Sequence, residues 1–326
     1  PIGRNTAPAI TAASLKANQI CKDSTLLVLP ADHIIQDEEK FVNVINKALD
    51  YVNDGKIVTF GITPNKPETG YGYIESKNAL NDEELKGEKI ENFIEKPNKF
   101  NAEKLIADKK YSWNSGIFFF KAKVMLDEVL KFSPEIYSLC KKSLRSDKLD
   151  FDFQRIDKKF FSCCETISID NAIMEKTNLG IVIPLNAGWS DIGNWESFWE
   201  VSKKDNLGNV TIGKVISQQI KNCYVRSENK LIAVIGLENL IIVESNDAVL
   251  VANKDKSQDI KHIVEILKKK GEPEATVHKT IFRPWGNYTS IAGGLNWQVK
   301  KIIVKPGESL SLQSHTHRAE HWVVVD

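Results

Sequence analysis

The chain has 326 residues, more than one average domain, and its length points to two or three domains. Hydrophobic residues make up 42% and charged residues 27%, as in an ordinary soluble globular protein. The net charge of +1 argues against a nucleic-acid or polyanion binder, and no apolar stretch is long enough to cross a bilayer. The five cysteines form no CxxC pair or metal-finger spacing, so we expect reduced thiols and a cytoplasmic protein.

The first half of the chain has the pattern of an α/β domain. Residues 5–20 predict a helix with Thr6 as its cap. The continuous apolar runs 25–30 and 56–62 are typical of buried parallel strands, and residues 37–54 between them have helical spacing. These segments predict a βαβ unit with a parallel sheet. Further elements are predicted as a helix at 101–110, a strand at 116–121 and a helix at 122–134.

The pattern changes near residue 205 to short strands separated by polar turns. Residues 222–236 and 239–253 both predict strand, turn and strand, and their first asparagines lie 17 positions apart, as stacked β-helix units would. An amphipathic helix follows at 257–271. From residue 272 the repeated strand pattern predicts the start of an all-β barrel. The predicted domains are therefore 1–204, 205–271 and 272–326.

Several polar residues fall at predicted element ends, where ligands bind in open α/β sheets. Asp32 follows the strand 25–30 and suits Mg²⁺ on phosphates, although a plain Asx turn is the alternative. The loop 67–74 has two glycines and two tyrosines, which can line a small-molecule site or simply form a hairpin. Asp191 lies in a Gly-bounded loop before a helix.

Two further stretches could bind a sugar phosphate. Glu95 and Lys96 can reach one ligand only if their strand ends there, which Pro97 favours; an exposed ion pair is the alternative. Asn114 is predicted at the start of a buried strand. Together these residues suit a reaction between two anions on a metal. Two unit charges about 4 Å apart repel by roughly 1 kcal/mol in water and about 4 kcal/mol at an effective dielectric near 20.

These stretches also match a family. The segments PIGRNTAPAI, LVLPADHII, PETGYGYI, FIEKP, WNSGIFFF, GWSDIGNWESFWE and QVKKIIVKPGESLSLQSHTHRAEHW occur in this order. Together they closely resemble the bifunctional mannose-1-phosphate guanylyltransferase/type II mannose-6-phosphate isomerase. The resemblance implies a Rossmann-like nucleotidyltransferase with a mixed, mostly parallel sheet, then a short β-helix-like segment and the start of a cupin β-barrel. It also implies GDP-mannose synthesis for polysaccharide, with GTP and mannose-1-phosphate as substrates.

The resemblance implies roles for individual residues of the transferase. It assigns Mg²⁺ to Asp32 and Asp191 and the phosphate of mannose-1-phosphate to Lys96, and these three are the expected catalytic residues. Mannose would contact Glu95, Asn114 and the Gly72 backbone, and Arg4 is a candidate at the nucleotide side.

The resemblance also implies an isomerase domain that interconverts mannose-6-phosphate and fructose-6-phosphate with a divalent metal, Zn²⁺ or Co²⁺. His315, His317 and Glu320 would be its ligands, and the two histidines share one face if this segment is a strand. The chain departs from the family at Asn171, where an aromatic residue is usual, and at Thr316, which interrupts three consecutive histidines.

The family's Gly-rich nucleotide loop and first strand would lie before Pro1, and most of the barrel would follow residue 326. We therefore expect a fragment that is poorly active in both reactions, from a parent that is a homo-oligomer. Two alternatives stay open at this point: an isomerase with an inactive front domain, and a non-catalytic regulatory or assembly subunit.

Overall fold

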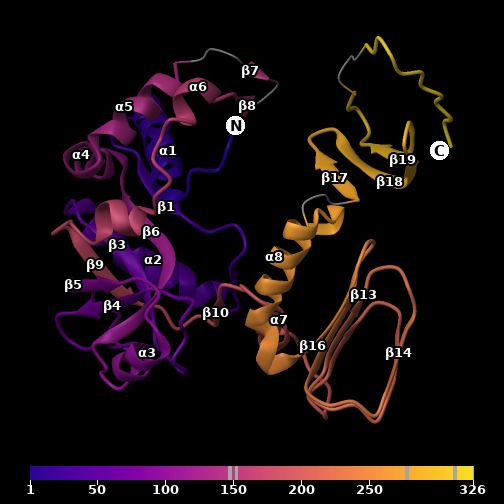
Figure 1. Ribbon diagram of the computed structural model, residues 1–326. Coiled ribbons are helices and arrows are strands. Elements are labelled where there is room, and N and C mark those ends of the chain that lie inside the picture. Colours follow the sequence, from indigo (N-terminus) through magenta and orange to yellow (C-terminus); the bar gives the residue numbers. More distant parts are fainter. Residues whose placement is uncertain (146–148, 151–152, 276–278, 311–313, 326) are drawn as a thin grey trace. The chain divides into compact units, whose positions relative to one another are not determined.

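The computed structural model describes residues 1–145, 149–150, 153–275, 279–310 and 314–325. The chain divides into two compact units, Pro1–Ile192 and Gly193–Asp326 (Figure 1). Within the described ranges, no helix combines the length and the apolar character needed to span a bilayer.

The first unit is built on a six-stranded sheet in the order β1-β6-β3-β9-β5-β4. Strand β6 pairs antiparallel with β1, β3 and β4, while β3 and β9 are parallel. The mixed sheet is confirmed, and β1 and β3 run in the same direction as predicted. They are not hydrogen-bonded to each other, because β6 lies between them. The strands are β1 (Thr25–Val28), β3 (Ile57–Ile62), β4 (Tyr73–Ser76), β5 (Glu88–Ile94), β6 (Tyr111–Lys121) and β9 (Gly180–Pro184).

Strand β6 buries side chains on both faces of this sheet. Ile117 and Phe119 pack into the core under helix α2 (Glu38–Asn53), whereas Phe118 and Phe120 belong to the core with α1, α4 and α5. Burying each such side chain stabilises the fold by roughly 1.5 to 3 kcal/mol. The remaining helices of the two layers are α1 (Thr6–Ile20), α4 (Ala122–Phe132) and α5 (Pro134–Ser143), which Figure 1 shows grouped together.

The cap of helix α1 lies one residue earlier than predicted. Asn5, with a φ of 63°, caps the helix, and its side chain accepts a hydrogen bond from the Thr6 amide. The Thr6 hydroxyl instead accepts a hydrogen bond from the amide of Ile169 at 2.8 Å. This bond ties α1 to the π-helix η1 (Asp170–Met174). The prediction of Thr6 as the cap was wrong because a long-range partner uses its hydroxyl.

Two short strands outside the main sheet pair with each other. In an antiparallel ribbon, β2 (Ile34–Ile35) pairs with β10 (Trp189–Ser190). The other short elements of this unit are α3 (Lys99–Ile106), β7 (Leu149–Asp150), β8 (Phe153–Gln154) and α6 (Lys158–Phe161).

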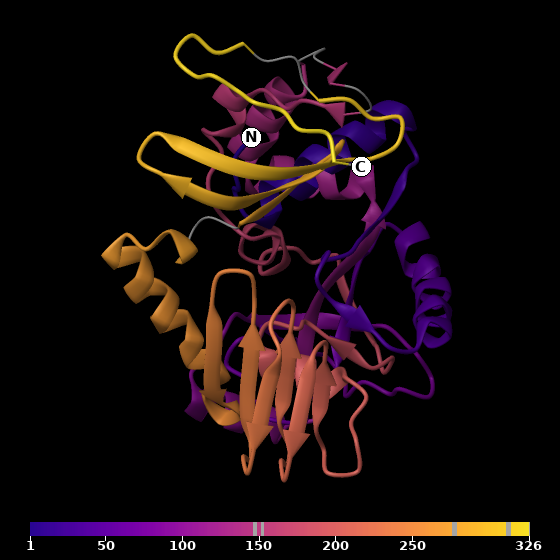
Figure 2. The same cartoon turned by 90° about the vertical axis from the view of Figure 1, so that its right-hand side faces the viewer.

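The second unit begins with α7 (Trp195–Val201) and continues as stacked short strands, shown side by side in Figure 2. Parallel ladders join β11, β13 and β15, and another joins β12 and β14. Asn229 donates a side-chain hydrogen bond to Asn246, 17 residues on, at 2.8 Å. The first strands of the two predicted repeats, β13 and β15, therefore stack in parallel as expected. Their second strands do not, because β14 pairs with β12 and β16 folds back antiparallel on β15. The strands are β11 (Val210–Ile212), β12 (Val215–Gln218), β13 (Tyr224–Ser227), β14 (Ile232–Ile235), β15 (Leu240–Glu244) and β16 (Val249–Asn253).

The last part of the chain contains a three-stranded antiparallel sheet. The strand expected around the final valines is not formed: residues 314–325 contain no strand, and Val323 is 83% exposed. A strand requires a hydrogen-bonded neighbour, and these residues have none within the part of the chain that the structure describes. The elements here are η2 (Lys254–Asp259), α8 (Ile260–Lys270), η3 (Pro273–Ala275), β17 (Thr280–Arg283), β18 (Gly286–Gly294) and β19 (Trp297–Val304).

Candidate active site

The β2–β10 ribbon brings two predicted metal-binding carboxylates together. Ser190 pairs with Ile34, so the same register places Asp191 opposite His33, next to Asp32. Burial lowers the pKa of His33, while Asp32 and Asp191 act on it in the opposite direction, so both carboxylates lie near this ring. Two loops more than 150 residues apart in sequence therefore meet here.

The chemistry of this donor pair fits Mg²⁺. Within the described ranges, no three His, Cys, Asp or Glu side chains gather into a metal-binding group. Mg²⁺ is commonly held by one or two carboxylates, with water and substrate phosphates as its other ligands. An acidic pair of this kind is compatible with Mg²⁺ that is also bound to substrate phosphates.

Aromatic side chains surround the acidic pair. The Tyr71 hydroxyl donates a hydrogen bond to Asp191 Oδ1 at 2.7 Å, and the Trp189 indole N–H donates to His33 Nδ1 at 3.2 Å. Ile192, directly after Asp191, has a φ of 44°. Positive φ is a true outlier for a β-branched residue, and such strain concentrates at functional sites.

Glu95 and Lys96 converge at the end of β5. Glu95 and Lys96 can contact one ligand only if the strand ends before them, and β5 does end at Ile94. Lys96 has a φ of 45°. This left-handed turn lets two adjacent side chains meet, with Lys96 Nζ lying 3.0 Å from Glu95 Oε1. The lysine side chain remains 63% exposed, so an incoming phosphate can reach it.

Gly72 allows the tyrosine loop to approach Glu95 closely. A Cβ at this position would lie only 2.9 Å from Glu95 Oε2 and 3.1 Å from the Phe93 ring. The Gly72 carbonyl accepts a hydrogen bond from the Asn114 amide at 2.8 Å. The structure thus brings Gly72, Glu95, Lys96 and Asn114 together.

Asn114 lies inside β6, whereas the sequence pattern placed it at a strand start. A bulge in the β3–β6 ladder separates the Asn114–Gly61 pair from the Phe118–Thr59 pair. Bulges often re-aim side chains next to active sites. Gly116, with a φ of 70°, lies within this bulge, and a Cβ on it would meet His33 Cε1 at 3.8 Å. The bulge therefore lies between Asn114 and His33, the residue beside the acidic pair.

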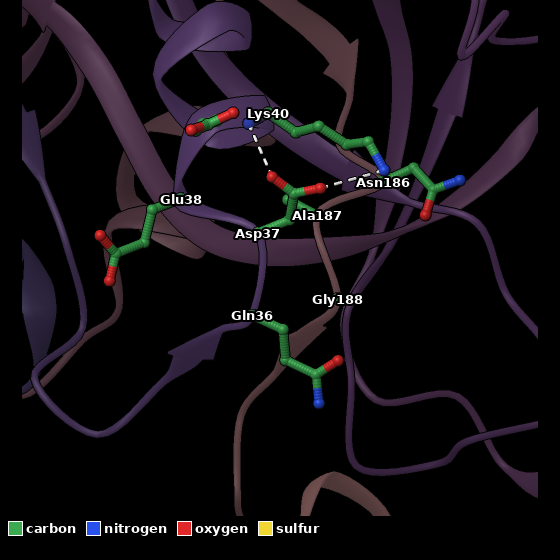
Figure 3. Close-up of a pocket in the computed structure, with 8 residues that line it drawn as sticks. Gln36, Asp37, Glu38, Lys40, Asn186, Ala187 and Gly188 are labelled. Carbon is green, nitrogen blue, oxygen red and sulfur yellow. Dashed lines mark hydrogen bonds and ion pairs between the residues drawn. The ribbon is translucent and has the colours of Figure 1, made fainter.

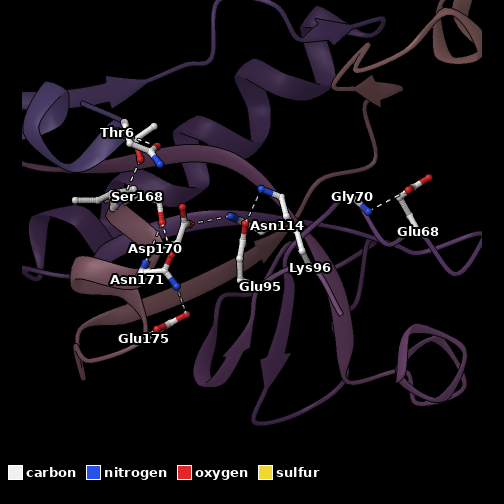
Figure 4. A network of polar contacts seen from close by, with 12 residues as sticks. Thr6, Glu68, Gly70, Glu95, Lys96, Asn114, Ser168, Asp170, Asn171 and Glu175 are labelled. Atoms are coloured by element: carbon white, nitrogen blue, oxygen red, sulfur yellow. Dashed lines mark hydrogen bonds and ion pairs between the residues drawn. The ribbon is translucent and has the colours of Figure 1, made fainter. Parts of the chain in front are cut away.

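Asp170 is a member of this cluster that the sequence did not single out. Figure 4 shows it beside Asn114, whose Nδ2 donates to Asp170 Oδ1 at 3.0 Å, while Asn114 Oδ1 accepts from the Thr59 hydroxyl at 3.1 Å. Burial, and then the charge of Glu95, raise the pKa of Asp170 to about 6. In the sequence it lies directly before Asn171, where the chain departs from the family, but only the hydrogen bond between η1 and β6 reveals its partner.

Arg4 is engaged with the segment before η1. Its guanidinium donates to the Thr166 hydroxyl at 3.0 Å and to the Ser162 carbonyl. Its buried Nε has no hydrogen-bond partner within the described part of the protein. These contacts tie the start of the chain to residues 162–166, and the proposed role of Arg4 at a nucleotide stays a prediction.

Two of the three predicted isomerase ligands lie together. His315 Nε2 is 3.1 Å from Glu320 Oε1, and the Arg318 guanidinium contacts both. The Arg318 side chain holds the pKa of Glu320 below its usual value. Glu320 reaches His315 across a bend at residues 316–317, whereas the strand expected to place His315 and His317 on one face is not formed among residues 314–325. With Arg318 on the same oxygen, and with no three-member group among the described residues, this arrangement does not by itself hold a metal.

A hollow of about 560 Å³ lies beyond the other end of β2, next to the start of α2. Figure 3 shows that Gln36, Asp37, Lys40 and Gly188 are among the residues that line it. Asp37 accepts a hydrogen bond from the Lys40 amide and caps α2. None of the predicted site residues lines this hollow, so it is separate from the candidate site.

Family comparisons agree with this arrangement. The Nucleotidyl transferase family matches residues 1–207, which is more than half of the chain. The MannoseP isomerase/GMP-like beta-helix domain matches residues 213–267, and the Mannose-6-phosphate isomerase C-terminal family matches residues 270–326.

Similar proteins make the assignment more specific. A mannose-1-phosphate guanylyltransferase from Salmonella montevideo is 50% identical over 329 residues, covering 100% of this chain and 69% of that protein. The chain belongs to the mannose-1-phosphate guanylyltransferase family. The xanthan biosynthesis protein XanB from Xanthomonas campestris is 47% identical, with coverage of 100% and 68%. A mannose-1-phosphate geranyltransferase structure from Thermus thermophilus has a TM-score of 0.72 at 28% identity, covering 82% of this chain and 76% of that one.

Asp170→Asn is expected to stabilise this guanylyltransferase in a pH-dependent way. The folded-state pKa of about 6 exceeds the ordinary value of 3.8, so an ionised Asp170 destabilises the fold above about pH 6. This penalty disappears as the pH falls toward 3.8. The variant should gain on the order of 1 to 3 kcal/mol in unfolding free energy near pH 8 and almost nothing near pH 4. Urea denaturation measures both values.

The exposed Glu165→Gln in the same segment provides the control and should show no such pH dependence. An equal gain for Asp170→Asn at both pH values would mean that the ionisation of Asp170 is not the cause.

Proposed function

We propose that this protein forms GDP-mannose and pyrophosphate from GTP and mannose-1-phosphate, in polysaccharide precursor synthesis. The observation that carries the proposal is the meeting of an acidic pair with a Glu–Lys–Asn cluster through the β6 bulge, in a chain 50% identical to a guanylyltransferase. A homo-oligomeric state and a cytoplasmic location stay predictions.

Asp32 and Asp191 would hold Mg²⁺ against the nucleotide phosphates. When bound, the ion supplies positive charge to the phosphoryl oxygens, where charge develops during transfer. The two carboxylates alone would repel a triphosphate, so this role for them requires the cation. The Tyr71 hydrogen bond fixes one oxygen of Asp191 before any ligand arrives.

Lys96 would neutralise the phosphate of mannose-1-phosphate. An oxygen of this phosphate attacks the α-phosphorus of GTP, a new P–O bond forms, and the bond from the α-phosphorus to the β-phosphate oxygen breaks as pyrophosphate leaves. The attacking oxygen is already ionised near neutral pH, so no side chain has to remove a proton. The protein therefore contributes positioning and charge.

Polar groups beside Lys96 would hold the sugar. Glu95 can accept hydrogen bonds from sugar hydroxyls, and the Gly72 backbone lies against it. The Asn114 side chain is held by Asp170 and Thr59, so its amide is oriented in advance. Such fixed polar groups reject ligands that leave them unpaired, which is the basis for proposing mannose selection here.

Asp191→Ala is expected to lower kcat for pyrophosphate release at least about 100-fold, because it removes half of the acidic pair. Release from GTP in the full-length protein should require both mannose-1-phosphate and Mg²⁺. Coupled detection of pyrophosphate measures the rate, and the exposed α4 substitution Asp127→Ala is the matched control. Normal turnover of Asp191→Ala would show that the metal assignment is wrong.

Lys96→Met should raise KM for mannose-1-phosphate roughly 10- to 100-fold and leave KM for GTP nearly unchanged. The physical reason is the loss of a charged hydrogen-bond donor to the sugar phosphate, which contributes about 1.5 to 3 kcal/mol. Steady-state kinetics with each substrate varied in turn separates the two constants. Lys99→Met, exposed at the start of α3, should change neither. An equal rise in both KM values would argue against a specific role on the sugar side.

The chain also supports a second activity at its C-terminal end. We infer that the protein interconverts mannose-6-phosphate and fructose-6-phosphate, because residues 270–326 match the Mannose-6-phosphate isomerase C-terminal family. His315, His317 and Glu320 stay the proposed ligands of a divalent metal, either Zn²⁺ or Co²⁺. Among the described residues only His315 and Glu320 of these three come together, so they support the binding role and no individual catalytic step.

His315→Ala should abolish isomerisation in the full-length protein and leave pyrophosphate release unchanged. The reason is that imidazole nitrogen is a preferred ligand of such metals, whereas the transferase site lies elsewhere in the sequence. A fructose-6-phosphate assay and bound-metal analysis test both points. His262→Ala on the exposed face of α8 is the control, and full isomerase activity with His315→Ala would exclude this ligand.

A further inference from the structure

We propose that Tyr71 is a positioning residue that couples sugar binding to metal binding. One end of the coupling is the metal-side carboxylate of Asp191, and the other is the sugar-side backbone of Gly72. This inference rests on the proposed function. It adds one residue, Tyr71, and a thermodynamic link between the binding of mannose-1-phosphate and the binding of Mg²⁺.

The metal end is a direct hydrogen bond from the Tyr71 hydroxyl to Asp191 Oδ1 at 2.7 Å. The tyrosine ring is held from two sides: its centroid lies 5.1 Å from that of Trp113 and 5.5 Å from that of Trp189, both edge-on. Edge-on contacts are a preferred geometry for aromatic pairs, so they restrict the position of the ring. The hydroxyl is therefore presented to Asp191 by a fixed ring.

The sugar end is the next residue in the chain. The Gly72 carbonyl accepts from the Asn114 amide at 2.8 Å, and the space at its Cα is filled by Glu95 and Phe93. Trp113, which packs on the Tyr71 ring, directly precedes Asn114. Two adjacent residues of the loop thus contact two adjacent residues of β6, so movement at Glu95 or Asn114 is transmitted to the tyrosine.

The remainder of this loop is held independently of Asp191. The Glu68 carboxylate accepts a hydrogen bond from the Gly70 amide at 3.1 Å. The Glu68 backbone carbonyl accepts one from the Tyr73 hydroxyl at 2.9 Å. Tyr73 and Tyr71 are therefore two tyrosines of one loop with different partners. Only the Tyr71 hydroxyl contacts the metal-side carboxylate among the hydroxyl bonds described for this loop.

The physical consequence is a reciprocal effect. A sugar phosphate that contacts Glu95, Gly72 and Asn114 restricts this loop and with it the Tyr71 hydroxyl. A fixed hydroxyl orients Asp191, and groups that orient a metal ligand typically change metal affinity 10- to 100-fold when removed. By linkage, sugar phosphate and Mg²⁺ must then strengthen each other's binding by the same factor.

The test compares Tyr71→Phe with Tyr73→Phe in the full-length protein. Calorimetric Mg²⁺ titrations, with and without saturating mannose-1-phosphate and without GTP, give a coupling factor independent of turnover. In the wild type, mannose-1-phosphate should tighten Mg²⁺ binding. Tyr71→Phe should weaken Mg²⁺ binding about tenfold and bring the coupling factor close to one, because only the hydroxyl is lost. Tyr73→Phe should keep the wild-type coupling.

Three outcomes would overturn the inference: an unchanged coupling factor in Tyr71→Phe, an equal loss in both variants, or no coupling in the wild type. Thermal unfolding of each variant shows whether the fold is intact. Failure of the proposed function is a different result, in which the wild type does not bind mannose-1-phosphate at all. The Mg²⁺ affinity of Tyr71→Phe measured without sugar phosphate still decides the role of its hydroxyl in that case.

Discussion

The candidate transferase site depends on one short backbone pairing, the ribbon between β2 and β10. It joins the loop after the first strand of the sheet to a loop at the end of the first unit, and so sets Asp32 and Asp191 around His33. Two nearby carboxylates repel each other, and the backbone hydrogen bonds of the ribbon keep Asp32 and Asp191 close despite this repulsion. A cation is then attracted to a place where the protein has already gathered negative charge.

The mixed sheet supplies the other half of the site. Because β6 runs between β1 and β3, its bulge lies beside the loop that follows β1, where Gly116 is close to Pro30 and His33. The same bulge sets Asn114 toward Asp170. An antiparallel strand inserted between two parallel ones thus brings the residues proposed to bind the sugar close to those proposed to bind the metal.

Local sequence patterns predicted much of the fold, for physical reasons that are themselves local. Apolar periodicity identified α2, β1, β3 and the strands of the second unit. The family resemblance selected residues that lie in two groups in the structure, the acidic pair and the cluster around Lys96. Long-range partners were beyond such patterns. Three features depend on segments that are distant in sequence. They are the insertion of β6 between β1 and β3, the hydrogen bond from the Ile169 amide to the Thr6 hydroxyl, and the burial of Asp170 beside Asn114. The Tyr71 bond to Asp191 is of the same kind.

The stacked strands of the second unit also limit how this protein can change in length. Strands β11, β13 and β15 pair in parallel from one turn to the next, as do β12 and β14, and Asn229 bonds to Asn246 one 17-residue repeat later. Because side chains alternate along a strand, inserting one residue would turn a buried face outward through the rest of that strand. Insertions within the strands should therefore be tolerated only when they add a complete repeat. This segment can thus lengthen by duplication of a repeat more readily than by the addition of single residues.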